Sequence, residues 1–155
     1  MEKPKVKVEF IITGDKLDFN LVNLITDRLK IKPNRYWIKG DTIEGANIRN
    51  IDTCWEVCTD YEESYYINDQ LTKIISKIKY KKDIINDITE TYDLECLFSI
   101  STNFRNGQTP AMVLEKDIIE FASDIKAEIY FDLYSYYTLE HLLEEDEFWR
   151  EFDKS

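Results

Sequence analysis

The chain has 155 residues, of which 43% are hydrophobic and 33% charged, and its formal net charge is −11. A chain of this length folds as about one domain and can bury a core without disulfides or metals. Its charge disfavours direct contact with nucleic acid and with anionic membrane surfaces. No stretch approaches the ~18 apolar residues of a spanning helix, and the cysteines are odd in number, so we expect a cytoplasmic protein with free, buried thiols at Cys54, Cys58 and Cys96.

The first third of the chain alternates between strand and helix patterns. Residues 5–12 alternate as a half-buried strand does, with one apolar face: Val6, Val8, Phe10 and Ile12. Asp18 is placed to cap a helix that Pro33 prevents from continuing. The turn-rich segment Lys39 to Asn50 predicts an extended surface loop, and residues 53–59 predict a second strand.

The remaining elements follow from two clear periodicities. Residues 69–92 predict one long amphipathic helix, because apolar side chains recur at helical spacing over about five turns. Residues 94–104 alternate as a strand, and Asn106-Gly107 predicts a hairpin turn into a return strand at residues 109–114. Pro110 would make that return strand an edge strand. A helix over about residues 115–126 and a last strand over residues 127–137 complete the pattern.

The order of elements predicts the fold class. The series β-α-β-α-β-β-α-β, with strands that alternate rather than being apolar throughout, indicates an α+β fold with a mostly antiparallel sheet of about five strands and helices on one face. We assign residues 1–137 to a single domain. Residues 138–155 hold seven acidic residues against two basic ones, and apolar residues recur there at near-helical spacing. We therefore expect a C-terminal acidic amphipathic helix docked on the domain.

Several motifs together resemble a known family. They are Gly-Asp-x-Leu-Asp at residues 14–18, Pro-x-x-x-Trp-x-x-Gly-Asp at residues 33–41, a strand that contains Trp55, and a late hydrophobic-Asp-hydrophobic-Tyr strand with Asp132 and Tyr134. In this combination the chain resembles the bacterial family catalogued as domain of unknown function 4279, over about residues 6–137. The resemblance implies a stand-alone cytosolic domain and no named activity. The tail from Thr138 lies outside the family pattern.

Two groups of aromatic residues are candidates for binding. In the segment PNRYWIKGD, residues 33–41, Tyr36 and Trp37 are either anchors of a binding loop or parts of a structural corner that closes the core after Pro33, and we favour the corner. In the last strand, alternation puts three tyrosines on the face of the sheet away from the helices: Tyr130, Tyr134 and Tyr136. They are either anchors for a partner, or are covered by the acidic tail or by the second protomer of a homodimer.

The sequence gives little support for the common catalytic and metal-binding patterns. His141 is the only histidine, which disfavours Ser-His-Asp and Cys-His catalysis. Cys54 and Cys58 supply two of the four ligands of a structural zinc site, and the four glycines are scattered, so they form no phosphate-binding loop. Turn and cap chemistry explains the aspartates that could converge on a cation: Asp15, Asp18 and Asp41. We expect no catalytic residue, metal or cofactor.

The leading hypothesis is a non-enzymatic protein-recognition module that binds a basic protein, with an inhibitor or immunity-type protein as one form of it. Complementary charge raises association rates, and aromatic side chains supply anchoring energy. Besides the loop candidates Tyr36 and Trp37, the candidate partner-binding residues are Tyr130, Tyr134, Tyr136, Glu144, Glu145, Asp146, Glu147 and Trp149. Two alternatives stay open: an acidic mimic of nucleic acid that inhibits a nucleic-acid-binding protein, and a carboxylate-dependent enzyme of unknown substrate.

Overall fold

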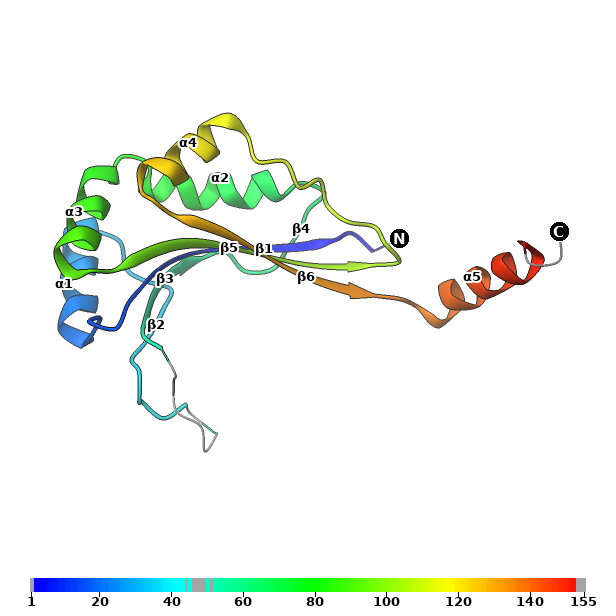
Figure 1. Ribbon diagram of the computed structural model, residues 1–155, viewed down its shortest axis with the longest axis horizontal. Helices are drawn as coiled ribbons and strands as arrows, with labels where there is room; N and C mark the ends of the chain where they lie inside the picture. The colour runs from blue at the N-terminus through cyan, green and yellow to red at the C-terminus, as the bar shows by residue number, and fades with distance from the viewer. Residues whose placement is uncertain (1, 44, 46–49, 51, 153–155) are drawn as a thin grey trace.

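A computed structural model of the chain describes residues 2–43, 45, 50 and 52–152. Within these residues one sheet is covered by helices, and a last helix leads away from the body (Figure 1). The elements in chain order are β1 (Lys5–Thr13), α1 (Phe19–Leu29), β2 (Arg35–Trp37), β3 (Cys54–Cys58), β4 (Glu62–Glu63), α2 (Ile67–Ile78), α3 (Lys82–Tyr92), β5 (Glu95–Arg105), α4 (Lys116–Asp124), β6 (Glu128–Tyr136) and α5 (Leu139–Phe152).

The sheet has six strands, five of them in the order β2-β3-β1-β5-β6, and β4 pairs with the start of β1. Every pairing is antiparallel except that of β5 with β6. That pair is parallel because the chain crosses back over the sheet through α4 before β6 begins, as parallel neighbours require. The predicted α+β class and mostly antiparallel sheet are confirmed, and β2 and β6 are the two edge strands of the main path.

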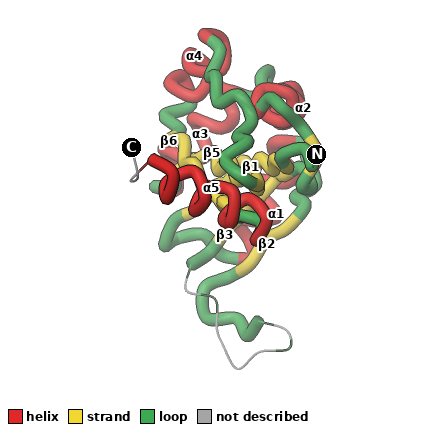
Figure 2. Tube along the Cα trace, turned by 90° about the vertical axis from the view of Figure 1, so that its right-hand side faces the viewer, coloured by secondary structure: helices red, strands yellow, loops and turns green. Residues whose placement is uncertain are grey.

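The core lies between one face of the sheet and helices α1 to α4. Alternate residues of β1 point into it and have 0% exposure: Val6, Val8, Phe10 and Ile12. The apolar stripes of the four helices join the same buried cluster, which includes Ile25, Ile74, Ile88 and Ile118. In the rotated view of Figure 2, α2 and α4 lie on one side of the sheet. We call the opposite side the open face.

Helix α1 begins and ends as its sequence predicts. The Asp18 side chain accepts a hydrogen bond of 2.8 Å from the backbone N–H of Leu21, which is one of the unsatisfied donors of the first turn. After Leu29, Lys30 adopts a left-handed conformation with φ of 56°, and Pro33 follows before β2.

Two predicted elements differ from the structure. Residues 69–92 do not form one helix: α2 ends at Ile78 and α3 begins at Lys82, although the apolar stripe keeps its phase, because Ile78 and Ile85 are seven residues apart. Asn106 and Gly107 do adopt the positive φ values of the expected turn, 51° and 71°. The return strand at residues 109–114 is wrong, however. Ala111 makes only an isolated bridge to Tyr66, and the neighbour of β5 on that side is β6.

The C-terminal segment forms a helix, but it does not lie on the body as we expected. Among residues 139–152, which the structure describes, none is buried, and α5 continues outward past the end of β6 (Figure 1). Of the expected loop from Lys39 to Asn50, residues 44 and 46–49 lie outside the described residues, as do residues 153–155 of the tail. No helix in the described part of the chain combines the length and apolar composition needed to cross a membrane.

Candidate functional site

Strand β6 exposes large side chains on both of its faces. Phe131 and Leu133 point to the same side as the core, yet they are 41% and 50% exposed, because the helices cover only the beginning of the strand, where Ile129 packs against the core. On the open face, Tyr130, Tyr134 and Tyr136 are between 43% and 53% exposed. The predicted orientation of these tyrosines is therefore the one observed, and we call the three residues the tyrosine face.

Carboxylates on the same strand orient two of these tyrosines. The hydroxyl of Tyr130 donates a hydrogen bond of 2.6 Å to Glu128, and the hydroxyl of Tyr134 donates one of 2.6 Å to Asp132. Residues two apart on a strand share a face, so each pair lies side by side. The hydrogen bonds raise the pKa of both phenols above their ordinary value. The tyrosine face thus presents fixed aromatic rings beside acceptor carboxylates.

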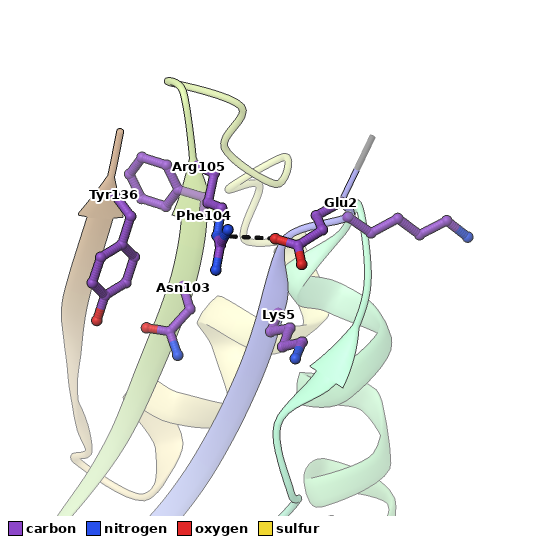
Figure 3. Close-up of a pocket in the computed structure, with 7 residues that line it drawn as sticks. Glu2, Lys5, Asn103, Phe104, Arg105 and Tyr136 are labelled. Atoms are coloured by element: carbon purple, nitrogen blue, oxygen red, sulfur yellow. Dashed lines mark ion pairs between the residues drawn. The ribbon is translucent and has the colours of Figure 1, made fainter. Parts of the chain in front are cut away.

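The far end of the tyrosine face has mixed charge. A pocket of about 160 Å³ lies there. In Figure 3, Tyr136, Asn103 and Lys5 project from three neighbouring strands to the same side of the sheet. Arg105 at this end pairs with Glu2 at 2.9 Å. Lys3 also lines the pocket. The acidic residues of the candidate surface are therefore concentrated on α5 rather than around Tyr136.

The start of α5 is fixed to the end of the sheet. The backbone N–H of Thr138 donates to the Asn106 side chain at 3.0 Å, and the Thr138 hydroxyl accepts from the N–H of His141 at 3.3 Å, as an N-cap residue does. The His141 ring stacks on Tyr137 at 5.6 Å. His141 also lies 3.4 Å from Glu145, one helical turn later.

Beyond this anchor, α5 carries an acidic stripe and an apolar stripe, and Glu145 and Asp146 lie among the apolar residues. The acidic stripe follows helical spacing and consists of Glu140, Glu144, Glu147 and Glu151. The apolar side chains are all at least 45% exposed, and they are Leu139, Leu142, Leu143, Phe148, Trp149 and Phe152. A lone helix of this length is marginal in water, and the apolar side chains of α5 are exposed.

The segment PNRYW forms the edge strand β2 instead of a corner. Arg35 pairs with Glu56 and Trp37 with Cys54 in the register of β2 with β3. Trp37 is half-buried, and its indole N–H donates to Asp52 at 2.8 Å. Tyr36 is exposed and packs against Phe19, with ring centroids 6.1 Å apart. The sequence does not predict this strand, because three residues are too few to show the alternation of a strand.

A groove lies next to β2, between that strand and α1. Its volume is about 610 Å³, and its lining includes Thr26, Lys32, Pro33 and Tyr36. Because β2 and β6 are opposite edges of the sheet, the structure does not bring Tyr36 and Trp37 together with the later tyrosines. It joins β6 to α5 as one candidate surface and leaves β2 as a separate one.

Tyr61 is a neighbour of the tyrosine face that sequence reasoning missed. It is exposed, it lies within electrostatic range of Tyr134, and the ammonium of Lys7 is 5.9 Å from its ring. The residue sits in the connection between β3 and β4, where no periodicity pointed to a face of the sheet. The aromatic surface therefore extends from β6 across the sheet towards β1.

Carboxylates line one cleft of the described structure, and the thiols lie in strands β3 and β5. One cleft at the end of the sheet is lined by four acidic residues that are all exposed: Asp15, Asp52, Asp93 and Glu95. Within the described ranges, no group of three or more histidine, cysteine, aspartate or glutamate side chains is placed to hold a metal ion. All three cysteines are unpaired, and Cys54 and Cys96 are buried as expected, whereas Cys58 is half-buried.

Comparison with known proteins adds one finding. The family model described as "Domain of unknown function (DUF4279)" matches residues 4–136. Neither the curated proteins nor the solved structures gave a match. The matched region includes the whole sheet and ends where β6 ends, so α5 lies outside it.

Proposed function

The chain belongs to the DUF4279 family, and we propose that it is a non-enzymatic protein-recognition module that binds a basic protein. The binding surface is the tyrosine face of β6 together with α5. The observation that carries the proposal is the exposure of β6 and α5: large aromatic side chains lie uncovered beside a concentration of acids. An inhibitor or immunity-type protein is one form of such a module.

The two parts of the surface have different tasks. Exposed tyrosine and tryptophan side chains provide most of the anchoring energy in typical interfaces, and here the anchors are Tyr130, Tyr134, Tyr136 and Trp149. The acids of α5 attract a basic partner from a distance and raise the rate of association, an effect that salt screens. Glu144, Glu145, Asp146 and Glu147 supply that charge.

We further propose a cytoplasmic location for this module. The thiols of Cys54, Cys58 and Cys96 are unpaired, which is the usual state in a reducing compartment. Binding to a basic partner would then take place inside the cell.

The test begins with capture of a partner from cytosol by the immobilised full chain, at low and high salt. The captured basic protein is purified, and its association rate with the chain is measured. In one variant the four acids of residues 144–147 become the corresponding amides. We expect the association rate at low salt to fall at least about tenfold. In the control variant four exposed acids of the body become amides: Asp15, Asp27, Asp60 and Glu63. Equal loss in both variants would contradict a specific role of α5.

The aromatic anchors have their own test. Tyr134→Ala should weaken the equilibrium affinity at least about tenfold, since hot-spot side chains contribute on the order of 2 kcal/mol or more. The matched control is Tyr80→Ala, because Tyr80 is 87% exposed and lies between α2 and α3. Unchanged affinity for Tyr134→Ala would remove the tyrosine face from the interface.

A second candidate function, the mimic of nucleic acid, draws on the acidic stripe of α5. Steps of three or four residues separate its carboxylates by about 4.5–6 Å along the helix axis. Each strand of DNA carries a phosphate about every 3.4 Å along its axis, so the stripe is sparser than a nucleic-acid strand. Competition decides between the two: if the partner is a nucleic-acid-binding protein and DNA or RNA displaces the chain from it, the mimic is favoured.

A further inference from the structure

The two edges of the sheet are built differently. β2 has three residues and follows Pro33, so it offers another chain little backbone to pair with. β6 has nine residues, each paired in continuous register with β5, and it contains no proline, glycine or lysine. Natural proteins usually protect an edge by shortness, proline, charged side chains or a bulge. β6 is long, has no proline and no bulge, and its two charged side chains, Glu128 and Asp132, accept hydrogen bonds from tyrosines of the same strand. Among the described strands β5 is its only neighbour.

We propose that the open edge of β6 is an interface between two copies of this chain, which pair β6 with β6 antiparallel about a twofold axis. Such pairing joins two six-stranded sheets into one continuous sheet. A twofold interface is isologous, so the same patch must complement itself. The proposal concerns pairing along the edge of β6, and it does not rest on the proposed binding of a basic protein.

The sequence of β6 is self-complementary around Leu133. An axis at this residue places Leu133 opposite its own copy, Tyr130 opposite Tyr136, and Asp132 opposite Tyr134. Aromatic pairs directly across two strands are stabilising, whereas like charges there are destabilising. In the single chain Asp132 already accepts a hydrogen bond from a tyrosine hydroxyl, that of Tyr134. An axis at Asp132 would instead set two carboxylates against each other, so charge disfavours that register, and the proposed pairing is the one centred on Leu133.

The exposed side chains along β6 set an upper limit on the area that the dimer can bury. The uncovered parts of the side chains along β6 and just after it amount to on the order of 700 Å², given the typical areas of such residues. They belong to Tyr130, Phe131, Leu133, Tyr134, Tyr136, Tyr137 and Leu139. A standard interface buries about 800 Å² on each partner, and smaller ones belong to weaker complexes. We therefore expect a dimer that dissociates in the micromolar range.

In the dimer the two tyrosine faces lie side by side. Because the axis is perpendicular to the sheet, the open faces of both copies lie on the same side, and two tyrosine faces become one strip of six rings. The helices α5 leave the strip at its opposite ends. Each copy carries a net charge of −11, so salt should strengthen the dimer by screening repulsion, while it should weaken the binding of a basic protein.

The oligomeric state of the full chain tests the proposal. Sedimentation equilibrium from about 2 to 200 µM should show a mass that rises from 18.5 kDa to twice that value, with tighter association at high salt. Leu133→Lys places two like charges face to face and should abolish the dimer, while the half-exposed site leaves folding intact, as circular dichroism can check. Tyr80→Lys adds the same charge at a distant exposed site and should still form the dimer. A chain that stays monomeric throughout, or a dimer that tolerates Leu133→Lys, overturns the proposal.

A covalent readout does not depend on the strength of the dimer. Facing residues in an antiparallel pair have Cα atoms about 4.5–5.5 Å apart, a separation that a disulfide can span. Leu133→Cys should therefore form disulfide-linked dimers rapidly under mild oxidation, whereas Tyr80→Cys should not. Equal rates for the two variants would contradict the register. If the chain binds a basic partner but fails both tests, the proposed function stands and pairing of β6 with β6 is contradicted.

Discussion

Arg35 and Glu56 form an ion pair on the open face, between edge strand β2 and its neighbour β3. The Glu56 carboxylate is 1% exposed and accepts two hydrogen bonds from the Arg35 guanidinium, at 3.0 and 2.8 Å. Arg35 also lies 3.1 Å from Glu9, whose carboxylate pairs with Lys7. A buried carboxylate is costly unless it is paired. The pair therefore attaches edge strand β2 to β3 by charge.

Removing the positive charge of Arg35 should show that the stability of the fold depends on this ion pair. Arg35→Met keeps most of the side-chain stem but leaves the Glu56 carboxylate buried without its donor, so we expect the free energy of unfolding to fall by about 1–3 kcal/mol. Urea unfolding measures the effect. Changing Glu56 to Met as well should recover part of the loss, since both charged partners are then absent. Lys39→Met, at an exposed site, is the control. An equal effect for Arg35 and Lys39 would contradict the account.

The cysteines have raised pKa values with a common cause. Burial raises the pKa of the Cys96 thiol to about 12, and burial together with a hydrogen bond to Glu56 raises that of Cys58 to about 11. Burial also raises the pKa of Cys54. The thiolate is the reactive form, so all three should be inert at neutral pH.

Thiol labelling at pH 8 tests this directly. Cys58, the half-buried thiol, should react first with a disulfide reagent, and Cys54 and Cys96 should react only as the protein unfolds. Below pH 9.0, the ordinary thiol value, native and unfolded chains both keep the proton. Above it the unfolded chain ionises first, so these thiols should make stability fall as pH rises. Rapid labelling of all three in the native protein would contradict their burial.

At the scale of single elements, the cap of α1 gives a clean prediction. Asp18→Ala removes the hydrogen bond to the N–H of Leu21 and should lower the free energy of unfolding by about 1 kcal/mol. Asp18→Asn should lower the free energy of unfolding much less, because asparagine is an equally good N-cap residue. Urea midpoints of the two variants decide the point, and equal losses would show that the side chain does not act as a cap.

Elements with a long, regular period could be predicted from the sequence. The alternation in β1, β5 and β6 identified these strands and the face of each side chain, because the period of a strand fixes sidedness. The turn at Asn106-Gly107 also forms, but a turn does not determine which strand becomes the next neighbour. That choice depended on α4, which carries β6 to the outer edge of β5.

The candidate surface could be predicted only in part. Alternation placed the tyrosines on the open face, but the exposure of Phe131 and Leu133 on the other side depends on how far the helices reach over β6, which no local pattern records. For the same reason the apolar stripe of α5 predicted a helix but not its position. Strands β2 and β4 have three and two residues, too few for any period.

At the scale of the whole molecule, α5 should contribute little to the stability of the body. No residue of α5 is buried, and the core closes without it. A chain that ends after Thr138 should therefore unfold in urea within about 0.5 kcal/mol of the full chain, the range typical of surface changes. A larger loss would show that the helix packs on its own domain, as the sequence pattern alone suggested.

In the proposed function, α5 and the tyrosine face form the binding surface and contribute little to the stability of the fold. The distribution of charge supports this division, because the acids of α5 lie beyond the region that the family model matches. Stability and recognition should then respond to different substitutions: those at Arg35 or Asp18 change unfolding, and those at Tyr134 or in residues 144–147 change binding.

The most direct test is the association rate of the captured basic protein with the full chain and with the chain that ends after Thr138, each measured over a range of salt concentrations. The full chain should associate at least about tenfold faster at low salt, and the advantage should disappear as salt screens the charges of α5. Equal rates for the two chains at low salt, or a rate that does not depend on salt, would contradict recognition of a basic partner through this helix.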